Sequence, residues 1–322
     1  MPIQRLRRLV SEDFEAVNAL IIEKIKSEVS LIDDLSNHLM QSGGKRLRPL
    51  LVLLACHACK YKGEHHIKLA AMIEFFHTAT LLHDDVIDES TMRRGRETAN
   101  EIWGSKASIL VGDYLFIQYM QLALEVGSLK IMDVLTQHFY EITRGEIKQL
   151  NNRHNTSLSE DEYFEIIRSK TSLLFAVSAA LGPMICDADE TIYQGLFNYG
   201  LHLGNAFQLI DDALDYSSNS ETLGKNIGDD LADGKATLPI LHAINHSDPV
   251  QKTLIIESLK TGNLSALPNI LSAIKSAKSL EYTRQVAEAE VDKAITSLQI
   301  LPDSVYKEAL VDLAHYAVSR DH

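Results

Sequence analysis

Two short acidic segments hold the side chains best suited to metal chemistry. They read DDVID at 84–88 and DDALD at 211–215, each at the end of an apolar stretch. Residues four positions apart share one face of a helix, so Asp84 lies with Asp88 and Asp211 with Asp215. Carboxylates on one face suit magnesium, which prefers oxygen ligands. One such segment alone is better explained as a solvated acidic helix end, but the repetition favours metal ions that clamp a diphosphate and stabilise its departure.

Basic residues near these segments suit a substrate that carries phosphate. The formal net charge of −13 disfavours nucleic-acid binding and means that an anionic substrate needs clustered cations or metal ions. Gly43-Gly44 supplies flexible backbone in front of three cations, and arginine offers phosphate a planar fork of donors. Each cation alone is more easily explained as an ordinary surface charge. Together with the doubled acidic segment they predict a site for two diphosphates, formed by Lys45, Arg46, Arg48, Arg93, Arg94, Lys170, Lys225 and Lys235.

The elements that must position these residues are helices. Apolar residues recur at helical spacing along most of the chain, and strand-like alternation is scarce. Ser159 is an expected N-cap, and Gly182-Pro183 is expected to end the helix that follows it. No linker or shift in composition marks a boundary, so the sequence predicts one all-α domain over 1–322, a bundle of long helices around a central cleft. The expected helices cover 11–39 (one helix or two), 67–89, 107–125, 129–151, 160–181, 192–216, 281–300 and 304–319, with others opening at Pro49 and Pro239.

Cysteines and apolar stretches bear on where the protein works. Three cysteines fit a reducing compartment without disulfides. Cys56 and Cys59 form a CxxC with His65 and His66 close behind, a combination that could indicate a zinc site. Buried thiols inside an apolar helix are the favoured interpretation. No apolar stretch follows the arginine-rich start, and nowhere do eighteen apolar residues run together. The sequence therefore predicts a cytoplasmic protein with no secretory signal and no transmembrane segment.

Several longer motifs carry a resemblance to a known family. They are GGKRLRP at 43–49, EFFHTATLLHDDVIDES at 74–90, MRRG at 92–95, LVGDYLF at 110–116, SKT at 169–171, GNAFQLIDDALDY at 204–216 and LGKNIGDDLADGKATLPILHA at 223–243. In this order they resemble the trans-polyprenyl diphosphate synthases, and among them most the bacterial octaprenyl diphosphate synthases. The resemblance covers essentially the whole chain. It implies the isoprenoid synthase fold and a transferase that lengthens an allylic diphosphate with isopentenyl diphosphate.

The resemblance also implies roles for single residues. Asp84, Asp88 and Asp211 match ligands of two or three magnesium ions, and Asp85, Asp212 and Asp215 match supporting positions. The positions that match the isopentenyl diphosphate site are Lys45, Arg48, His77 and Arg94. The positions that match contacts to the allylic diphosphate are Arg93, Lys170, Thr171, Gln208, Lys225 and Lys235. No motif residue is missing, which implies an active enzyme.

The implied product is a long all-trans polyprenyl diphosphate, expected to be octaprenyl (C40), which a homodimer builds from farnesyl diphosphate and passes to the membrane for a quinone side chain. A tail growing from Asp84 toward the start of its helix gains about one helical turn, 5.4 Å, per unit. Ala79 and Thr80 are small and leave that path open, whereas short-chain relatives tend to carry aromatic residues there. Tight helix packing at both positions is the alternative. Phe75 and Phe76 are expected a turn deeper, and the floor of the tunnel is expected from Tyr119, Met132 or Phe139.

Two rival functions share part of this pattern. A terpene cyclase has an aspartate-rich helix, but it consumes one diphosphate and needs no GGKRLR segment. A non-catalytic subunit of a heteromeric synthase is expected to lack one acidic segment, and both are present here. Chain elongation itself needs no serine or cysteine nucleophile, because an allylic cation forms as diphosphate leaves and the released diphosphate accepts the proton.

Overall fold

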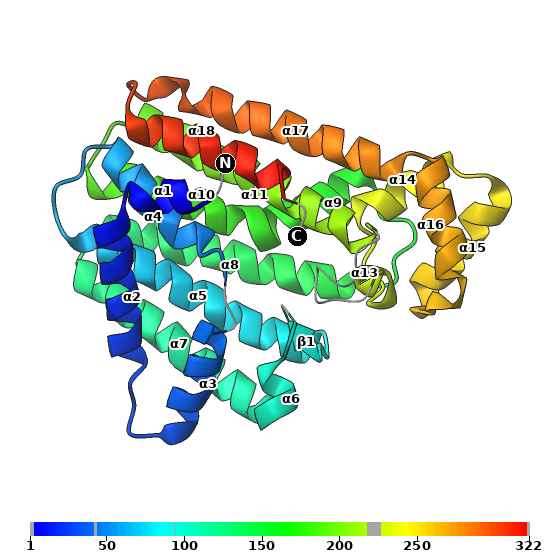
Figure 1. The fold of residues 1–322 in the computed structure, drawn as a ribbon, viewed down its shortest axis with the longest axis horizontal. Helices are drawn as coiled ribbons and strands as arrows, with labels where there is room; N and C mark the ends of the chain where they lie inside the picture. Colours follow the sequence, from blue (N-terminus) through cyan, green and yellow to red (C-terminus); the bar gives the residue numbers. More distant parts are fainter. Residues whose placement is uncertain (1–2, 42–43, 94, 218–226, 321–322) are drawn as a thin grey trace. The chain divides into compact units, whose positions relative to one another are not determined.

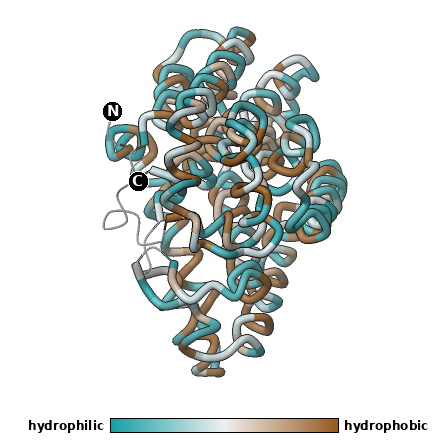
Figure 2. The backbone as a smooth tube through the Cα atoms, turned by 90° about the vertical axis from the view of Figure 1, so that its right-hand side faces the viewer, coloured by the Kyte–Doolittle hydropathy of each residue, from teal (hydrophilic) through white to brown (hydrophobic). Residues whose placement is uncertain are grey.

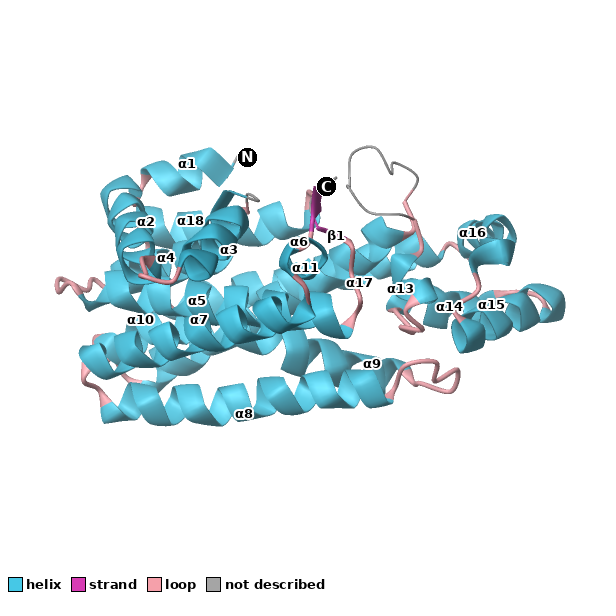
Figure 3. Cartoon of the chain, turned by 90° about the horizontal axis from the view of Figure 1, so that it is seen from below, coloured by secondary structure: helices cyan, strands magenta, loops and turns pink. Residues whose placement is uncertain are grey.

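Helices form nearly all of the computed structural model, which describes residues 3–41, 44–93, 95–217 and 227–320 (Figure 1, Figure 3). The α-helices up to residue 151 are α1 (Ile3–Arg8), α2 (Ser11–Ile25), α3 (Ser30–Gln41), α4 (Leu47–Ala58), α5 (His65–Ile87), α6 (Ala99–Trp103), α7 (Ser105–Val126) and α8 (Leu129–Asn151). Those that follow are α9 (Glu160–Ile167), α10 (Leu173–Ile185), α11 (Glu190–Asp215), α13 (Asp229–Ala232), α14 (Leu238–His246), α15 (Pro249–Thr261), α16 (Leu267–Ser276), α17 (Ser279–Ser297) and α18 (Val305–Val318). The shorter helical turns are η1 (Arg168–Ser172), η2 (Leu264–Ala266) and η3 (Leu298–Ile300). The predicted all-helical class is confirmed.

One small antiparallel hairpin is the β-structure of the described residues. Its strands are β1 (Met92–Arg93) and β2 (Arg96–Glu97), with Met92 opposite Glu97. Gly95 adopts φ 75° in the turn, a left-handed conformation that glycine reaches without a steric penalty. The hairpin follows directly after the first acidic segment, and it was not predicted from the sequence.

Two compact units divide the described helices. Unit 1 consists of 1–136, 177–197 and 298–313, and unit 2 consists of 137–176, 198–297 and 314–322. Each unit is assembled from separate stretches of the chain, so neither is a continuous segment that a linker would delimit. The expectation of a single domain over the whole chain stays a prediction.

In unit 1, α5 is the helix around which the others pack. Its neighbours are α2, α4, α6 and α7. Buried side chains lie on most sides of α5, whereas α2 buries one stripe formed by Phe14, Val17, Ile21 and Ile25. Burial of this kind stabilises by about 25 cal/mol per Å² of apolar surface removed from water. The last turn of α5, which carries the first acidic segment, therefore belongs to a helix that is packed on most sides.

The predicted end of a helix at Gly182-Pro183 is wrong, because α10 continues through Pro183 to Ile185. A side chain on Gly182 would meet the Ala55 carbonyl carbon at 2.6 Å, so α10 and α4 approach each other backbone to backbone at this point. Proline in a last turn removes only one hydrogen bond. We infer that the close packing against α4 outweighs that loss.

In unit 2, a single apolar core joins α9, the end of α11 and α13 to α17. Its fully buried members include Leu209, Leu238, Ile255 and Ile270. The predicted N-cap of α9 is confirmed, since Ser159 and Glu162 form a reciprocal capping box. The helix expected over 160–181 is continuous in the structure, but the π-helical turn η1 lies within it, between α9 and α10.

Polar and apolar residues are interleaved along the helices (Figure 2). One helix of the described residues, α7, is long and apolar enough to span a membrane by length and composition, and half of its most apolar window is buried inside the fold. The core helix of a soluble protein passes the same test. The expectation of no transmembrane segment stays a prediction.

Candidate active site

The first acidic segment ends α5. Asp88 is the C-cap residue, and its backbone N–H donates to the carbonyl oxygen of Asp84 at 2.8 Å. Asp84 and Asp88 are half-buried, whereas Asp85 is buried with 1% of its surface exposed. The helix thus holds two partly accessible carboxylates one turn apart and turns the third into the protein.

A hairpin arginine neutralises that third carboxylate. Nε and Nη2 of Arg93, on β1, lie 2.8 and 2.6 Å from the same Oδ1 of Asp85. Burial lowers the pKa of Arg93, but the hydrogen bond to Asp85 and the negative charges of Asp85, Asp84 and Asp88 together raise it more, so the net pKa lies above its usual value. Arg93, expected at the allylic diphosphate, therefore has a clear structural partner, and its contact with substrate stays a prediction. Arg94 lies outside the described residues.

Two of the residues expected to bind isopentenyl diphosphate lie together in unit 1. Nη1 of Arg48, on α4, is 3.0 Å from Nε2 of His77, on α5. Two adjacent residues before α4 are anchored to unit 1: Arg7 donates to the carbonyl oxygen of Lys45 at 2.6 Å, and Arg46, with φ 40°, bonds the Asn18 side chain. A left-handed non-glycine residue needs such support, since it costs about 1–3 kcal/mol. The segment that holds Lys45 and Arg48 is therefore shaped before any ligand arrives.

The second acidic segment ends α11, in unit 2. Asp212 is buried and accepts hydrogen bonds from the Tyr163 hydroxyl at 2.5 Å and from Nε2 of Gln208 at 2.7 Å. Burial and the nearby Asp230 raise the pKa of Asp212 well above its usual value, although these two hydrogen bonds lower it. Asp212 is thus a support for the segment rather than an open ligand. Asp215 accepts from the backbone N–H of Asp230 at 3.3 Å.

Asp211, the predicted metal ligand of this segment, is half-exposed and contacts an arginine from the end of the chain. Nη1 of Arg320 lies 3.2 Å from Oδ1 of Asp211. The same guanidinium donates through Nη2 to the carbonyl oxygen of Phe207 at 2.8 Å and stacks over the Phe207 ring at 3.7 Å. Arg320 is 6% exposed, so this contact is a built feature of unit 2.

The π-helical turn η1 carries two residues expected at the allylic diphosphate. In it the backbone N–H of Leu173 bonds the carbonyl oxygen of Arg168, five residues back, and such turns are frequent at functional sites. Oγ1 of Thr171 donates to Oε1 of Gln208 at 2.9 Å, so Thr171, Gln208 and Asp212 form one hydrogen-bonded chain. Nζ of Lys170 lies 2.6 Å from Oε2 of Glu146.

The remaining predicted contacts lie in or near the loop after α11. Nζ of Lys235 is 2.9 Å from Oδ2 of Asp233, and its backbone N–H bonds the carbonyl oxygen of Asp230. Lys225 lies outside the described residues. Asp84 belongs to unit 1 and Asp211 to unit 2, so the shared ligand expected for the two acidic segments stays a prediction.

The residues expected to set chain length lie on α5 inside unit 1. Ala79 is 2% exposed, and Oγ1 of Thr80 donates to the carbonyl oxygen of His77 at 2.8 Å. Phe76 packs one turn earlier against Phe116 and Tyr119 of α7, with ring centroids 6.0 and 5.6 Å apart. Going from Asp84 toward the start of α5, the small residues therefore come first and the aromatic cluster next. The role of these residues in chain length stays a prediction.

Known proteins with the same arrangement are polyprenyl diphosphate synthases. The polyprenyl synthetase family model matches residues 29–275. The chain is 46% identical over 322 residues to an octaprenyl diphosphate synthase of Escherichia coli, with all of both chains covered. It is 42% identical to an all-trans-nonaprenyl-diphosphate synthase (geranyl-diphosphate specific) of Rhodobacter capsulatus, covering 97% of this chain and 96% of the relative. A polyprenyl synthase of Caulobacter crescentus, solved with calcium and isoprenyl diphosphate, has a TM-score of 0.96 at 42% identity, covering 99% and 98%.

Fold, motifs and comparisons together define a prenyl diphosphate synthase with the all-helical isoprenoid synthase fold. The chain belongs to the polyprenyl synthetase family, and the resemblance inferred from its motifs is confirmed.

Sequence reasoning missed two residues that contribute to the site, and one pairing. Tyr163 and Arg320 lie outside the quoted motifs, and the partners they contact are distant in sequence. Arg93 was noticed, but its pairing with Asp85 was not. Only the structure shows that Asp212 is buried, and a buried carboxylate requires hydrogen-bond donors from elsewhere in the chain.

Proposed function

We propose that this chain is a magnesium-dependent octaprenyl diphosphate synthase that condenses isopentenyl diphosphate repeatedly with farnesyl diphosphate. The observation that carries the proposal is full-length similarity to an octaprenyl diphosphate synthase, together with both acidic segments intact. The C40 product is a quinone side-chain precursor, formed in the cytoplasm and passed to the membrane.

The donor sets of the two acidic segments fit magnesium. Asp84, Asp88 and Asp211 offer carboxylate oxygens that are partly exposed, whereas their neighbours Asp85 and Asp212 are buried and satisfied by protein donors. Oxygen-only donors at helix ends are the type that magnesium prefers. Two or three bound ions supply positive charge that stabilises the departing diphosphate.

Cationic side chains of the protein bind the diphosphate groups of the two substrates. Lys45, Arg48 and His77 hold isopentenyl diphosphate, whereas Lys170 and Lys235 hold the allylic diphosphate. The allylic C–O bond breaks, the π bond of isopentenyl diphosphate forms the new C–C bond, and the resulting cation loses a proton to the released diphosphate. Hydrogen bonds that fix these cations beforehand reduce the reorganisation needed during ionisation.

Product analysis tests the activity. Pure protein with farnesyl diphosphate, labelled isopentenyl diphosphate and Mg²⁺ should give a C40 diphosphate. Asp84→Ala and Asp211→Ala should each lower turnover by orders of magnitude with an unchanged helical circular dichroism spectrum. Asp303→Ala is the control, because the Asp303 side chain is fully exposed and paired with Lys307. A cyclised hydrocarbon would support the terpene cyclase, and activity only after adding a second protein would support a partner subunit.

Steady-state kinetics separate the two diphosphate sites. Arg48→Ala should mainly raise the KM for isopentenyl diphosphate, and Lys170→Ala should mainly raise the KM for the allylic substrate, because binding lost equally in ground and transition states appears in KM. Equal defects for both substrates in both variants would contradict the assignment.

A homodimer is the proposed state of the enzyme. The exposed face of α7 is unusually apolar for a surface, with Leu110 at 67%, Leu124 at 65% and Ile117 at 49% exposure. A contiguous apolar stripe of this kind marks an interface, and a second copy of this chain is the occupant that family membership favours. Leu110→Glu with Leu124→Glu should give a monomer by light scattering, whereas Val250→Glu on α15, equally exposed at 71%, should not. A double variant that keeps the wild-type mass would contradict the proposal.

A further inference from the structure

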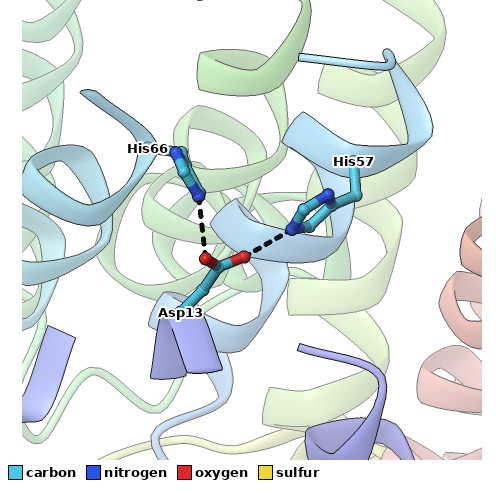
Figure 4. Close-up of side chains that lie close together, drawn as sticks. All are labelled: Asp13, His57 and His66. Carbon is cyan, nitrogen blue, oxygen red and sulfur yellow. Dashed lines mark hydrogen bonds and ion pairs between the residues drawn. The ribbon is translucent and has the colours of Figure 1, made fainter. Parts of the chain in front are cut away.

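Three side chains from three helices of unit 1 converge away from the acidic segments. Asp13 on α2 accepts from Nε2 of His57 on α4 at 2.5 Å through one oxygen, and its other oxygen lies 3.2 Å from Nε2 of His66 on α5 (Figure 4). One carboxylate oxygen and the two imidazole nitrogens all lie within 4.8 Å of one another. The diphosphate chemistry proposed above uses none of these residues.

The site is well separated from the carboxylates at the end of α5. His66 and Asp84 are 18 residues apart on the same helix, which corresponds to about 27 Å along its axis. A ligand at the three-residue cluster therefore cannot contact a diphosphate held at Asp84.

We propose that Asp13, His57 and His66 bind a divalent transition-metal ion of the zinc class. Two imidazole nitrogens and one carboxylate are a common donor set for zinc, whereas magnesium prefers oxygen alone. Zinc–ligand distances of 2.0–2.1 Å in a tetrahedron place ligand atoms about 3.3 Å apart. The two imidazole nitrogens lie 2.5 and 3.2 Å from different oxygens of Asp13, and one ligand atom from each residue lies within 4.8 Å of the other two. Side-chain rotations that change these separations by about 1–2 Å therefore bring the three ligand atoms to the spacing of a zinc site.

The charge and accessibility of the cluster suit a cation. The Asp13 carboxylate supplies the acidic group of the cluster, and each of its oxygens lies within 3.2 Å of one imidazole nitrogen. The side chains of Asp13 and His57 are each 26% exposed, which leaves a path for the ion and room for water as a fourth ligand.

Aromatic neighbours hold both imidazoles in place. The His57 ring stacks on Tyr306 at 4.8 Å, and the His66 ring meets Tyr61 edge-on at 5.7 Å. Zinc on Nε2 leaves the ring proton on Nδ1, and Nδ1 of His66 is buried without a hydrogen-bond partner among the described residues. Metal-bound histidines usually donate that second proton. We therefore expect a zinc affinity below that of a site in which every histidine donates this second hydrogen bond.

This site differs from the zinc site that was considered for the CxxC motif in the sequence. Cys56 is buried, and Cys59 interacts with the half-buried Cys186, so the thiols lie outside the cluster. Of the residues in that early hypothesis only His66 contributes. The other two ligands, Asp13 and His57, come from positions whose spacing in the sequence gives no zinc pattern.

Zinc titration of the full chain tests the proposal. Protein stripped with EDTA is titrated with Zn²⁺ against a chromogenic chelator, in excess Mg²⁺ that occupies the acidic segments. The wild type should bind one tight equivalent and melt at a higher temperature with zinc. His57→Ala and His66→Ala should weaken that binding by about 100-fold or more, because even residues behind the ligands are worth 10–100-fold.

Two further variants make the result decisive. Asp13→Asn keeps a hydrogen-bond acceptor and lacks the charge, so it should fold and still lose the tight equivalent. His246→Ala is the control, because His242 and His246 form another close imidazole pair, with ring centroids 4.0 Å apart on α14. Zinc affinity that is equal in wild type and Asp13→Asn, or a loss seen only in His246→Ala, would overturn the proposal and leave Asp13 as the centre of a hydrogen-bond cluster only.

Discussion

Replacing Arg93 by alanine should destabilise the protein through the carboxylate that it leaves behind. Asp85 is buried, with 2% of its side chain exposed, whereas the Arg93 side chain is 27% exposed. Loss of the arginine therefore strands a charge that water cannot reach, and breaking a buried pair in this way costs about 3–5 kcal/mol.

Replacing Asp85 by asparagine should lower the free energy of unfolding less than replacing Arg93 by alanine. Asp85→Asn removes the buried charge, and the partly exposed Arg93 then turns toward water, so we expect a loss of about 1–3 kcal/mol. The double variant leaves no stranded charge and should lose little more than Asp85→Asn alone. The expected coupling energy between the two sites is about 2 kcal/mol or more, at the upper end for residues in direct contact.

Urea unfolding of the four proteins measures this coupling. The Arg144–Glu141 pair on α8 provides the matched control, because it is 66% and 45% exposed and should couple by less than about 1 kcal/mol. If Arg93→Ala and Asp85→Asn are additive, or if Arg93→Ala costs no more than Arg144→Ala, the argument from the stranded carboxylate is wrong.

Three other perturbations follow from the described contacts. Ala79→Tyr, at a position 2% exposed, should cost about 1–3 kcal/mol through overpacking and shorten the product to C15–C20, as read by chromatography; a folded, active variant that still makes C40 would contradict a tunnel along this face. Arg320→Ala should lower stability by about 2–4 kcal/mol, with Arg320→Lys restoring only part because lysine lacks the planar fork; an unchanged urea midpoint would refute the role of Arg320. Burial raises the pKa of Glu290, but hydrogen bonds from His202, Lys293 and Asn205 lower it from 4.5 to about 2. This carboxylate therefore contributes about 3 kcal/mol that is present above pH 4.5 and lost as the pH falls toward 2. Relative to wild type, Glu290→Gln should show a flatter dependence of stability on pH across that window, and identical profiles would disprove the assignment.

Periodicity and motif order were enough for the helical class, the family and most helix boundaries. The expected helix over 129–151 matches α8 at both ends, because its apolar face repeats regularly and Gly127 ends the helix before it. The capping box at Ser159 was equally readable, since both partners lie within one turn.

Features that depend on contacts between residues distant in the sequence could not be predicted from the sequence. Arg320 contacts Asp211 across 109 positions, and nothing in either local sequence encodes that pairing. Pro183 is a strong local stop signal, but contact between α10 and α4 overrides it. The hairpin at β1 is too short to show an alternating pattern.

The π-helical turn η1 makes the neighbourhood of Lys170 sensitive to the number of residues rather than to their identity. A π-turn is equivalent to one amino acid inserted into an α-helix, and each residue of a helix turns the chain by about 100°. Deleting Ser169 would fuse α9, η1 and α10 into one regular helix and rotate everything before the deletion relative to everything after it. Thr171 and Tyr163 would then no longer reach Gln208 and Asp212 at the same time. Deleting one residue would thus break this hydrogen-bonded arrangement although all four side chains that form it are kept.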